Sequence, residues 1–156
     1  MTATMIIRAA RPGDLDSLTA LLKILFSIEE DFLFNEMLQR RGLQLMLDND
    51  LACILVAEAN GQVIGMCSGQ LTVSTAEGGP ALLVEDVVVF PEWHGRGIGR
   101  GLMESLGEWG REKGVSRLQL LADRNNGPAL DFYDKLGWRT MELICLRKRL
   151  SPRKGR

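Results

Sequence analysis

The chain has 156 residues, 46% of them hydrophobic and 25% charged, with a formal net charge of −1. This length suits one globular domain with its own core, and the near-neutral charge argues against a nucleic-acid-binding surface. No apolar run reaches the about 18 residues of a membrane-spanning helix, and the N-terminus lacks a signal-peptide core, so we expect a cytoplasmic protein without membrane or nucleic-acid partners.

The N-terminal half predicts a strand, two helices and a hairpin. A short apolar strand at 6–9 is followed by Asp14, which can cap a helix. The apolar face of that helix is formed by Leu15, Leu18, Leu22 and Leu25. An acidic break at 27–31 precedes a second helix over about 32–47. Two apolar runs, 54–59 and 63–73, then flank Asn60-Gly61, which is a strong signal for a two-residue hairpin turn.

The C-terminal half predicts alternating strands and helices. A flexible loop is expected at 75–80, and the later elements are strands at 81–90, 117–122 and 141–149 and helices at 102–113 and from Asn126 onward. Strand runs outnumber helices, and both hairpin and crossover connections occur. We therefore expect one α/β domain over residues 1–150 with a mixed sheet, followed by a basic tail at 151–156.

A glycine-rich turn lies between the strand at 81–90 and the helix at 102–113. Its sequence is His94-Gly95-Arg96-Gly97-Ile98-Gly99-Arg100-Gly101. A strand, a glycine turn and a helix start in this order expose backbone N–H groups at the positive end of the helix, which favours a polyanion such as a pyrophosphate. The turn lacks the Lys-Ser/Thr of a Walker loop and the spacing of a dinucleotide fingerprint. A tight connection without a ligand is the alternative.

Two adjacent carboxylates, Glu85 and Asp86, interrupt the apolar strand. Carboxylates are rare in buried strands unless they have a partner or a role. With a period of two, Glu85 shares a face with Val87 and Val89, and Asp86 faces the opposite side with Val88. One of the two can be a salt-bridge partner. The other is a candidate general base whose pKa burial would raise, with Glu85 favoured and Asp86 the alternative.

The chain carries two longer motifs in order, VEDVVVFPEWHGRGIGRGLM at 84–103 and NGPALDFYDKLGW at 126–138. Together they resemble the motifs of the GCN5-related N-acetyltransferase (GNAT) family. The resemblance covers nearly the whole chain. It implies a single-domain α/β (α+β) fold with a mixed, mostly antiparallel sheet of six to seven strands, about four flanking helices and a splayed central strand pair. It also implies acetyl-CoA as cosubstrate, no metal, and a tendency to form homodimers.

The resemblance also implies roles for individual residues. Glu85 would take the ammonium proton of an amine, directly or through a water, and Tyr133 would protonate the leaving thiolate. Cofactor contacts are expected at Val87, Val88, Val89, Gly95, Arg96, Gly97, Ile98, Gly99, Arg100, Asn126 and Tyr133. Asn126 is also a candidate helix N-cap, and Tyr133 a candidate core residue of an amphipathic helix.

His94, the only histidine, stands where the family motif has Gln or Arg, although the overlapping frame at 96–101, which begins with Arg96, also fits the motif. A lone histidine near a carboxylate strand is a candidate base. Its position within the glycine loop instead favours packing of the loop or a phosphate contact. The backbone N–H groups of the loop do not depend on which of these roles applies.

The implied reaction is direct transfer of an acetyl group from the thioester to a primary amine in a ternary complex. The motifs look most like those of spermidine/spermine N-acetyltransferases, and a polyamine-like or aminoglycoside-like small molecule is the expected acceptor. The acids that could line a pocket for a cationic amine are Glu29, Glu30, Asp31 and Asp86. The alternatives are a protein N-terminal or lysine acetyltransferase and a non-catalytic acyl-CoA-binding module.

The three cysteines, Cys53, Cys67 and Cys145, lie in apolar strand-like segments without metal-binding spacing. We therefore expect buried thiols rather than ligands or nucleophiles. Neither motif contains a cysteine, so no acyl-enzyme is expected.

Overall fold

The computed structural model describes residues 4–29 and 32–154 in two compact units, the first ending at Leu120 and the second beginning at Leu121. Within the described part of the first unit, five strands form one sheet in the order β1-β2-β3-β4-β5. They are β1 (Met5–Ala9), β2 (Ala52–Ala59), β3 (Gln62–Ser74), β4 (Gly79–Val89) and β5 (Leu118–Leu120). Only β4 and β5 pair in parallel. The sheet is mixed and mostly antiparallel, as expected.

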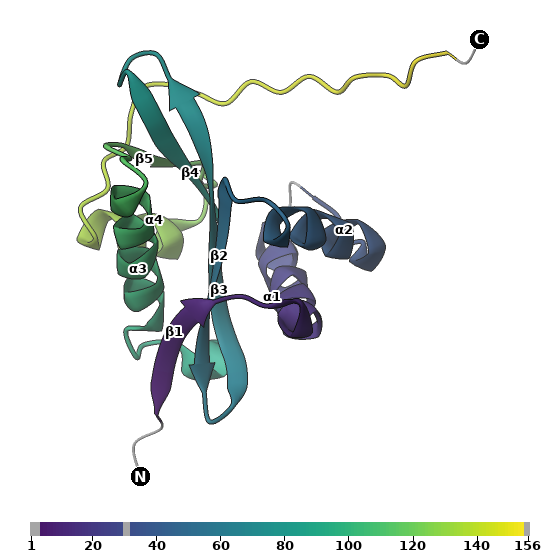
Figure 1. The fold of residues 1–156 in the computed structure, drawn as a ribbon, viewed down its shortest axis with the longest axis vertical. Helices are drawn as coiled ribbons and strands as arrows, with labels where there is room; N and C mark the ends of the chain where they lie inside the picture. Colours follow the sequence, from purple (N-terminus) through teal and green to yellow (C-terminus); the bar gives the residue numbers. More distant parts are fainter. Residues whose placement is uncertain (1–3, 30–31, 155–156) are drawn as a thin grey trace. The chain divides into compact units, whose positions relative to one another are not determined.

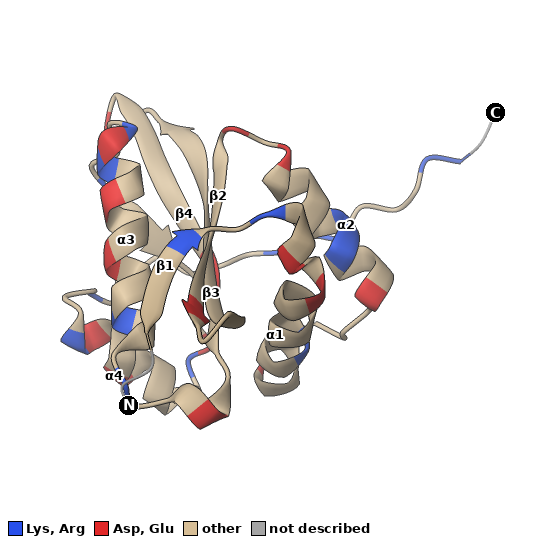
Figure 2. Ribbon diagram, turned by 60° about the horizontal axis from the view of Figure 1, so that its bottom comes forward, with Lys and Arg blue, Asp and Glu red and all other residues tan. Residues whose placement is uncertain are grey.

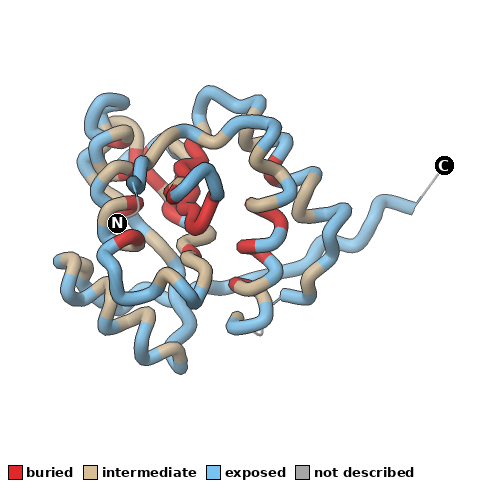
Figure 3. Tube along the Cα trace, turned by 90° about the horizontal axis from the view of Figure 1, so that it is seen from below, coloured by how far each residue is buried: buried red, intermediate tan, exposed pale blue. Residues whose placement is uncertain are grey.

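Three helices of the first unit cover the two faces of this sheet (Figure 1). α1 (Leu15–Ile28) and α2 (Glu36–Leu47) lie on one face, the α1–α2 face, and α3 (Ile98–Glu112) lies on the other, the α3 face. Buried stretches run along the strands and the inward sides of the helices (Figure 3). The second unit contains α4 (Gly127–Lys135). No helix in the described residues is both long and apolar enough to cross a membrane.

Close packing positions α3 against the sheet. On the α1–α2 face, the buried cluster is formed by Leu18, Leu21, Leu22, Leu25, Leu43, Ile54, Val56, Val63, Met66 and Val88.

On the α3 face, β3 carries glycines where the helix crosses it. A Cβ atom on Gly65 would lie 3.3 Å from Leu102 Cδ1, and one on Gly69 would lie 3.3 Å from Leu106 Cδ1. These contacts hold α3 close to the sheet, and with it the glycine loop that precedes α3.

The hairpin predicted at Asn60-Gly61 is confirmed. Asn60 and Gly61 have φ angles of 52° and 77°, and consecutive residues with positive φ are typical of the type I′ turn that suits a two-residue hairpin. The predicted loop at 75–80 is shorter in the structure. Residues 75–78 form a turn, and β4 already begins at Gly79. α2 begins at Glu36 rather than near residue 32. Asn35 is its N-cap residue, and the Asn35 side chain accepts a hydrogen bond from the Leu38 N–H.

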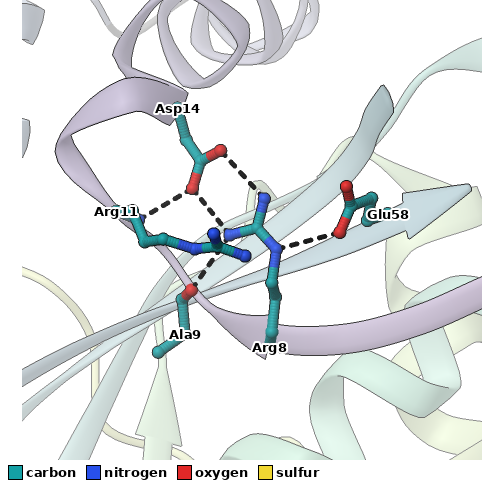
Figure 4. Close-up of polar contacts among 5 residues, drawn as sticks. All are labelled: Arg8, Ala9, Arg11, Asp14 and Glu58. Carbon is teal, nitrogen blue, oxygen red and sulfur yellow. Dashed lines mark hydrogen bonds and ion pairs between the residues drawn. The ribbon is translucent and has the colours of Figure 1, made fainter. Parts of the chain in front are cut away.

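Asp14 precedes α1 but does not cap it with its side chain. The Asp14 carboxylate instead accepts the Arg11 N–H at 2.7 Å and two hydrogen bonds from the Arg8 guanidinium at 2.8 and 3.0 Å (Figure 4). Arg8 also donates to Glu58 at 3.0 Å. A guanidinium offers bidentate, charge-assisted hydrogen bonds that a capping interaction cannot match. One cation thereby joins β1, β2 and the turn before α1.

The prediction of a last strand at 141–149 is wrong. Within the described chain, residues 139–154 belong to no helix or strand and are exposed. Leu143 and Leu146 each keep 87% of their surface exposed. The apolar sequence has strand propensity, but a strand also needs a neighbour that takes up its backbone N–H and C=O groups. Without that pairing the described sheet has five strands rather than six to seven.

Candidate active site

β4 contains a bulge at the two adjacent carboxylates. Across the ladder, Glu85 lies opposite Ser68 and Val88 lies opposite Met66. Asp86 and the residue after it therefore share one opposing residue of β3. The φ angle of Asp86 is 50°, in the left-handed region that aspartate enters more readily than most residues. A bulge inserts one residue into a strand and re-aims the side chains around it.

The bulge places Glu85 and Asp86 on the same face of the sheet. Residues opposite each other in an antiparallel pair share a face, so Glu85 is on the side of Ser68. The Ser68 hydroxyl lies 3.2 Å from the Asp86 carboxylate and 3.0 Å from the Glu85 carbonyl oxygen. Met66, two residues before Ser68, packs among the α1 leucines, so this side is the α1–α2 face. The prediction that Asp86 faces away from Glu85 is wrong, because strict alternation assumes no inserted residue.

Asp86 is the less exposed carboxylate of this site: it is half-buried, whereas Glu85 is exposed. Burial, followed by the nearby negative charge of Glu85, raises the pKa of Asp86 to about 6. The charge of Glu29 also raises this pKa, whereas the Ser68 hydrogen bond lowers it. At neutral pH the carboxyl is then mostly ionised, yet it accepts a proton more readily than an ordinary aspartate. That combination is suited to a general base.

The other acids predicted to take part in catalysis or to bind the amine lie in different parts of the chain. Glu85 is exposed. Glu29 is the C-cap residue of α1, where its N–H donates to the Leu25 carbonyl at 2.9 Å. Glu30 and Asp31 lie outside the described residues. The structure thus brings Glu85 and Glu29 within electrostatic reach of Asp86.

Beyond the bulge, one edge of β4 has no strand beside it in the described residues. β5 pairs only with Leu82, Leu83 and Val84. The Phe90 N–H donates to the Ile64 carbonyl on the β3 side. Because neighbouring residues of a strand point their backbone groups to opposite edges, Val89 presents its N–H and C=O to the open edge. Such an edge can hydrogen-bond an extended ligand as a further strand would.

The glycine loop continues from this edge into α3. It begins with the 3₁₀ turn η2 (Pro91–Trp93) and ends at Gly97, the N-cap residue of α3. Gly95 and Gly97 have φ angles of 77° and 79°, which favour glycine. Among the described residues no side chain caps α3. The first N–H groups of α3 therefore remain as donors at the positive end of the helix, where an anion is stabilised.

Side chains in and after the loop make contacts close to it. His94 Nε2 lies 2.8 Å from the Val89 carbonyl oxygen. The Arg96 guanidinium lies over the Trp93 ring, 4.5 Å from its centroid. Arg100 is exposed in the first turn of α3 and forms an ion pair of 3.8 Å with Glu104, one turn later. Further charged residues lie along α3 (Figure 2). Both arginines therefore lie near the start of α3.

Two residues predicted to contact the cofactor contribute their side chains to the core. Val88 is 7% exposed and packs in the cluster on the α1–α2 face, and Ile98 is 3% exposed at the start of α3. The side chains of these two residues are therefore not available to a ligand. Their side chains instead anchor the end of β4 and the beginning of α3, which flank the loop.

The second motif lies in the second unit. The Asn126 side chain accepts the Ala129 N–H at 3.2 Å, so Asn126 is the N-cap residue of α4. Tyr133 is half-buried on α4, and its ring centroid lies 5.8 Å from that of Trp138. The Trp138 N–H donates to the Tyr133 carbonyl at 3.0 Å. Tyr133 is thus held by the residues that end its own helix.

The cysteines differ in their environments. Cys53 and Cys67 are buried, whereas Cys145 is exposed, so the expectation of three buried thiols is wrong for Cys145. Cys145 belongs to the segment that forms no strand. Burial raises the pKa of Cys53 to about 11 and raises that of Cys67 further. Both thiols therefore stay protonated at neutral pH and are poor nucleophiles.

The family model for acetyltransferases of the GNAT family matches residues 17–138. The chain belongs to the GNAT family. The matched residues include the bulged strand, the glycine loop and α4. The fold is accordingly a single-domain α/β acetyltransferase fold, with five strands and four α-helices in the described residues.

Solved structures of acetyltransferases share this fold. The aminoglycoside N-acetyltransferase AAC(6')-Iy in complex with CoA has a TM-score of 0.84 at 22% identity, covering 96% of this chain and 98% of its own. A protein described as a predicted acetyltransferase of Clostridium acetobutylicum, with acetyl-CoA, has a TM-score of 0.77 at 22% identity, covering 92% and 96%. An acetyltransferase of Trypanosoma brucei has a TM-score of 0.73 at 27% identity, covering 94% and 100%.

Ser68 is a site residue that the sequence did not single out. It lies in an otherwise apolar run and is fully buried. A hydroxyl in a buried strand needs a hydrogen-bond partner, and this was the available signal. That the partner is Asp86 depends on the register between β3 and β4, which the sequence does not specify.

Proposed function

We propose that the chain is an acetyl-CoA-dependent N-acetyltransferase that transfers the acetyl group directly to a primary amine of a small cationic acceptor. The observation that carries this proposal is the placement of Asp86 and the start of α3 on one continuous segment. A half-buried carboxylate in a strand bulge is followed, after the open edge of β4, by a helix N-terminus without a side-chain cap. In this proposal, the groups for proton removal and for anion binding follow one another along the chain.

The pyrophosphate of acetyl-CoA would bind the N–H groups of residues 95–100. The positive φ angles at Gly95 and Gly97 shape the loop that carries these groups, and the helix dipole adds a partial positive charge. Arg96 and Arg100 would add charge beside them. The pantetheine arm would then lie along the open edge of β4, where Val89 presents its backbone N–H. This arrangement brings the thioester toward Val87 and Asp86 in the bulge, whose backbone N–H groups would polarise the thioester carbonyl.

The acceptor amine must lose a proton before it attacks. We assign this step to the carboxylate pair, with Asp86 as the group that takes the proton and Glu85 as the exposed acid that attracts the ammonium form. The expectation from the sequence was the reverse. The reassignment is supported by the burial of Asp86 and by its Ser68 hydrogen bond, which orients the carboxylate.

Tyr133 would donate a proton to the leaving thiolate of CoA. A phenol has a pKa near that of a thiol, so proton transfer between them is nearly balanced. Replacement of Tyr133 by Phe removes only the hydroxyl and preserves the contact between the ring and Trp138. Turnover should therefore fall while the melting temperature changes little.

A small polyamine or aminoglycoside is the acceptor class that we propose. Three negative groups, Glu85, Asp86 and Glu29, interact on the α1–α2 face, and a cationic amine would relieve their mutual repulsion. The aminoglycoside acetyltransferases among the structures with this fold are consistent with such an acceptor. A primary amine that carries further positive charges should react faster than a neutral one.

The deciding experiment measures release of free CoA thiol from acetyl-CoA with a panel of amines. We expect turnover with spermidine or an aminoglycoside to exceed turnover with a neutral amino-acid amide or a lysine peptide. Asp86→Asn should reduce the rate about 10²–10⁴-fold and remove the acidic limb of the pH–rate profile near pH 6, and Glu85→Gln should mainly raise the KM for the amine.

Three outcomes would contradict parts of this proposal. Acetyl-CoA binding without turnover on any amine would indicate an acyl-CoA-binding module instead. Preference for a peptide amine would favour a protein acetyltransferase. If Glu85→Gln removes the acidic limb and Asp86→Asn does not, the assignment of the two carboxylates is inverted.

A further inference from the structure

His94 makes a contact that neither the fold nor the proposed chemistry requires. Its imidazole Nε2 lies 2.8 Å from the carbonyl oxygen of Val89, the last residue of β4. A carbonyl oxygen can only accept, so Nε2 must carry the proton and donate it. The contact thereby selects one neutral tautomer of the ring. It spans the 3₁₀ turn η2, with which the glycine loop begins after the end of the strand.

The acceptor of this hydrogen bond lies at the open edge of β4. Val89 points its carbonyl away from β3, and β5 reaches only as far as Val84 along the strand. In a longer ladder, the Val89 carbonyl would accept from a neighbouring strand. Here the His94 side chain takes that place. A loop residue thus substitutes for a missing strand at the point where β4 ends.

The contact closes the first turn of the loop together with two backbone hydrogen bonds. The Trp93 N–H donates to the Phe90 carbonyl at 2.9 Å, and the His94 N–H donates to the Pro91 carbonyl at 3.1 Å. Both backbone bonds stay within the turn, whereas the imidazole bond ties the turn back to the sheet. The residue after His94 is Gly95, where the backbone enters positive φ. The direction of the following N–H groups depends on where this turn is held.

We propose that His94 is a positioning residue that ties the glycine loop to β4 and so orients the loop N–H groups for a pyrophosphate. This inference rests on the proposed function, because it concerns the same cofactor. His94 need not touch the pyrophosphate. It acts through the Val89 carbonyl, by reducing the freedom that the loop must lose when the cofactor binds.

Glutamine and asparagine provide a matched pair of variants. The amide nitrogen of Gln extends about as far as Nε2 of histidine, whereas that of Asn extends only about as far as Nδ1. His94→Gln should therefore keep the hydrogen bond to Val89, and His94→Asn and His94→Ala should lose it. Because the side chain is exposed, all three variants are expected to fold.

The first measurement is the dissociation constant of CoA by titration calorimetry. We expect His94→Asn and His94→Ala to bind CoA about five- to tenfold more weakly than the wild type, as for the loss of one hydrogen bond, with His94→Gln within about twofold of wild type. The second measurement compares acetyl-CoA with S-acetylpantetheine, which lacks the pyrophosphate. The Asn and Ala variants should lose kcat/KM with acetyl-CoA but not with S-acetylpantetheine, because only acetyl-CoA engages the loop.

The tautomer of the free protein gives a readout without cofactor. His94 is the only histidine, so long-range ¹H–¹⁵N spectra contain a single imidazole, and it should be protonated at Nε2. The Nδ1-protonated tautomer would overturn the inference. So would equal CoA affinity in all variants, or an equal loss with both acetyl donors. If the wild type itself binds no CoA, the proposed function fails as well, whereas wild-type binding with unaffected variants overturns only the role of His94.

Discussion

Asp86 combines two conditions that each oppose folding. Its backbone has a φ angle of 50°, and its carboxylate is removed from water beside a second carboxylate. Sparsely populated backbone angles and buried charges both cost free energy, and both are concentrated at functional sites. In this chain they coincide at the residue to which we assign proton removal. Asp86 therefore lowers the stability of the folded protein at the position where the proposed chemistry needs a proton acceptor.

The burial of Asp86 predicts how stability depends on pH. In the unfolded chain the carboxyl titrates near 3.8, whereas in the folded protein the pKa is about 6. Above pH 6 the folded state must bury a charge that the unfolded state keeps in water. Below about pH 4 the group is neutral in both states and this cost disappears. The contribution of Asp86 to the free energy of unfolding therefore falls as the pH rises from about 4 to 6.

Asp86→Asn tests this directly, because Asn accepts the same hydrogen bond from Ser68 and tolerates positive φ equally well. At pH 7 the variant should be more stable than the wild type by on the order of 1–3 kcal/mol, and the difference should vanish near pH 4. Urea unfolding at the two pH values measures it. Glu85→Gln, at an exposed position, removes one of the charges that raise the pKa of Asp86, and it should recover only a smaller part of this difference at pH 7. A variant that is less stable than wild type at pH 7 would contradict the assigned cost.

Among the elements, α3 offers a comparison between two glycines with opposite roles. Gly97 is the N-cap residue with a φ angle of 79°, whereas Gly107 lies within the helix, and an added Cβ meets nothing within 4 Å at either position. Gly97→Ala should therefore lower stability by about 1 kcal/mol through backbone strain and weaken CoA binding. Gly107→Ala should raise stability by about 0.5–1 kcal/mol and leave binding unchanged. Thermal unfolding and calorimetry of both variants check this, and equal effects would show that the loop conformation does not matter.

The Arg8 cluster is the second element-scale feature, because one guanidinium links β1, β2 and the turn before α1 (Figure 4). The hydrogen bond from Arg8 holds the pKa of Asp14 below its usual range. The stabilisation is therefore present at neutral pH and is lost as the pH falls below 3.8, through the folded-state pKa.

Arg8→Met should lower the free energy of unfolding by about 1–3 kcal/mol at pH 7, because it leaves two mostly buried carboxylates without their partner. Near pH 2 the difference should shrink as Asp14 becomes protonated. Arg40 forms ion pairs with Asp16 and Glu36 at exposed positions. Arg40→Met is the control and should cost clearly less than Arg8→Met, because exposed ion pairs contribute little to stability. Denaturant titration at both pH values distinguishes the two, and equal costs would contradict the structural role of Arg8.

At the scale of the whole molecule, the described chain offers no activated thiol for a covalent intermediate. Cys53 and Cys67 are buried with raised pKa values, and Cys145 lies in the exposed segment after α4. The amine should therefore attack the thioester while both substrates are bound. Initial-rate plots should intersect, as expected for a ternary complex, and conversion of all three cysteines to Ala or Val should keep turnover within about tenfold. Parallel plots, or an acetylated cysteine that passes its acetyl group to the amine, would overturn direct transfer.

The sequence by itself determined the features that depend on neighbouring residues. Asn60-Gly61 specified its hairpin, because two residues that accept positive φ favour one turn type. The glycine loop and the apolar period after it predicted a strand–turn–helix unit, and that unit is present between β4 and α3. The same local motifs carried the resemblance to the GNAT family that the family match confirms.

The tertiary structure decided every feature that depends on a partner far along the chain. Asp86 joins Glu85 on one face because β3 and β4 pair with a bulge, whereas alternation alone placed the two on opposite faces. Residues 141–149 have the composition of a strand but no pairing neighbour, so they form none. Local propensity describes what a segment can adopt. Register, burial and pairing are set by distant segments, and these decided which carboxylate is buried and which strands exist.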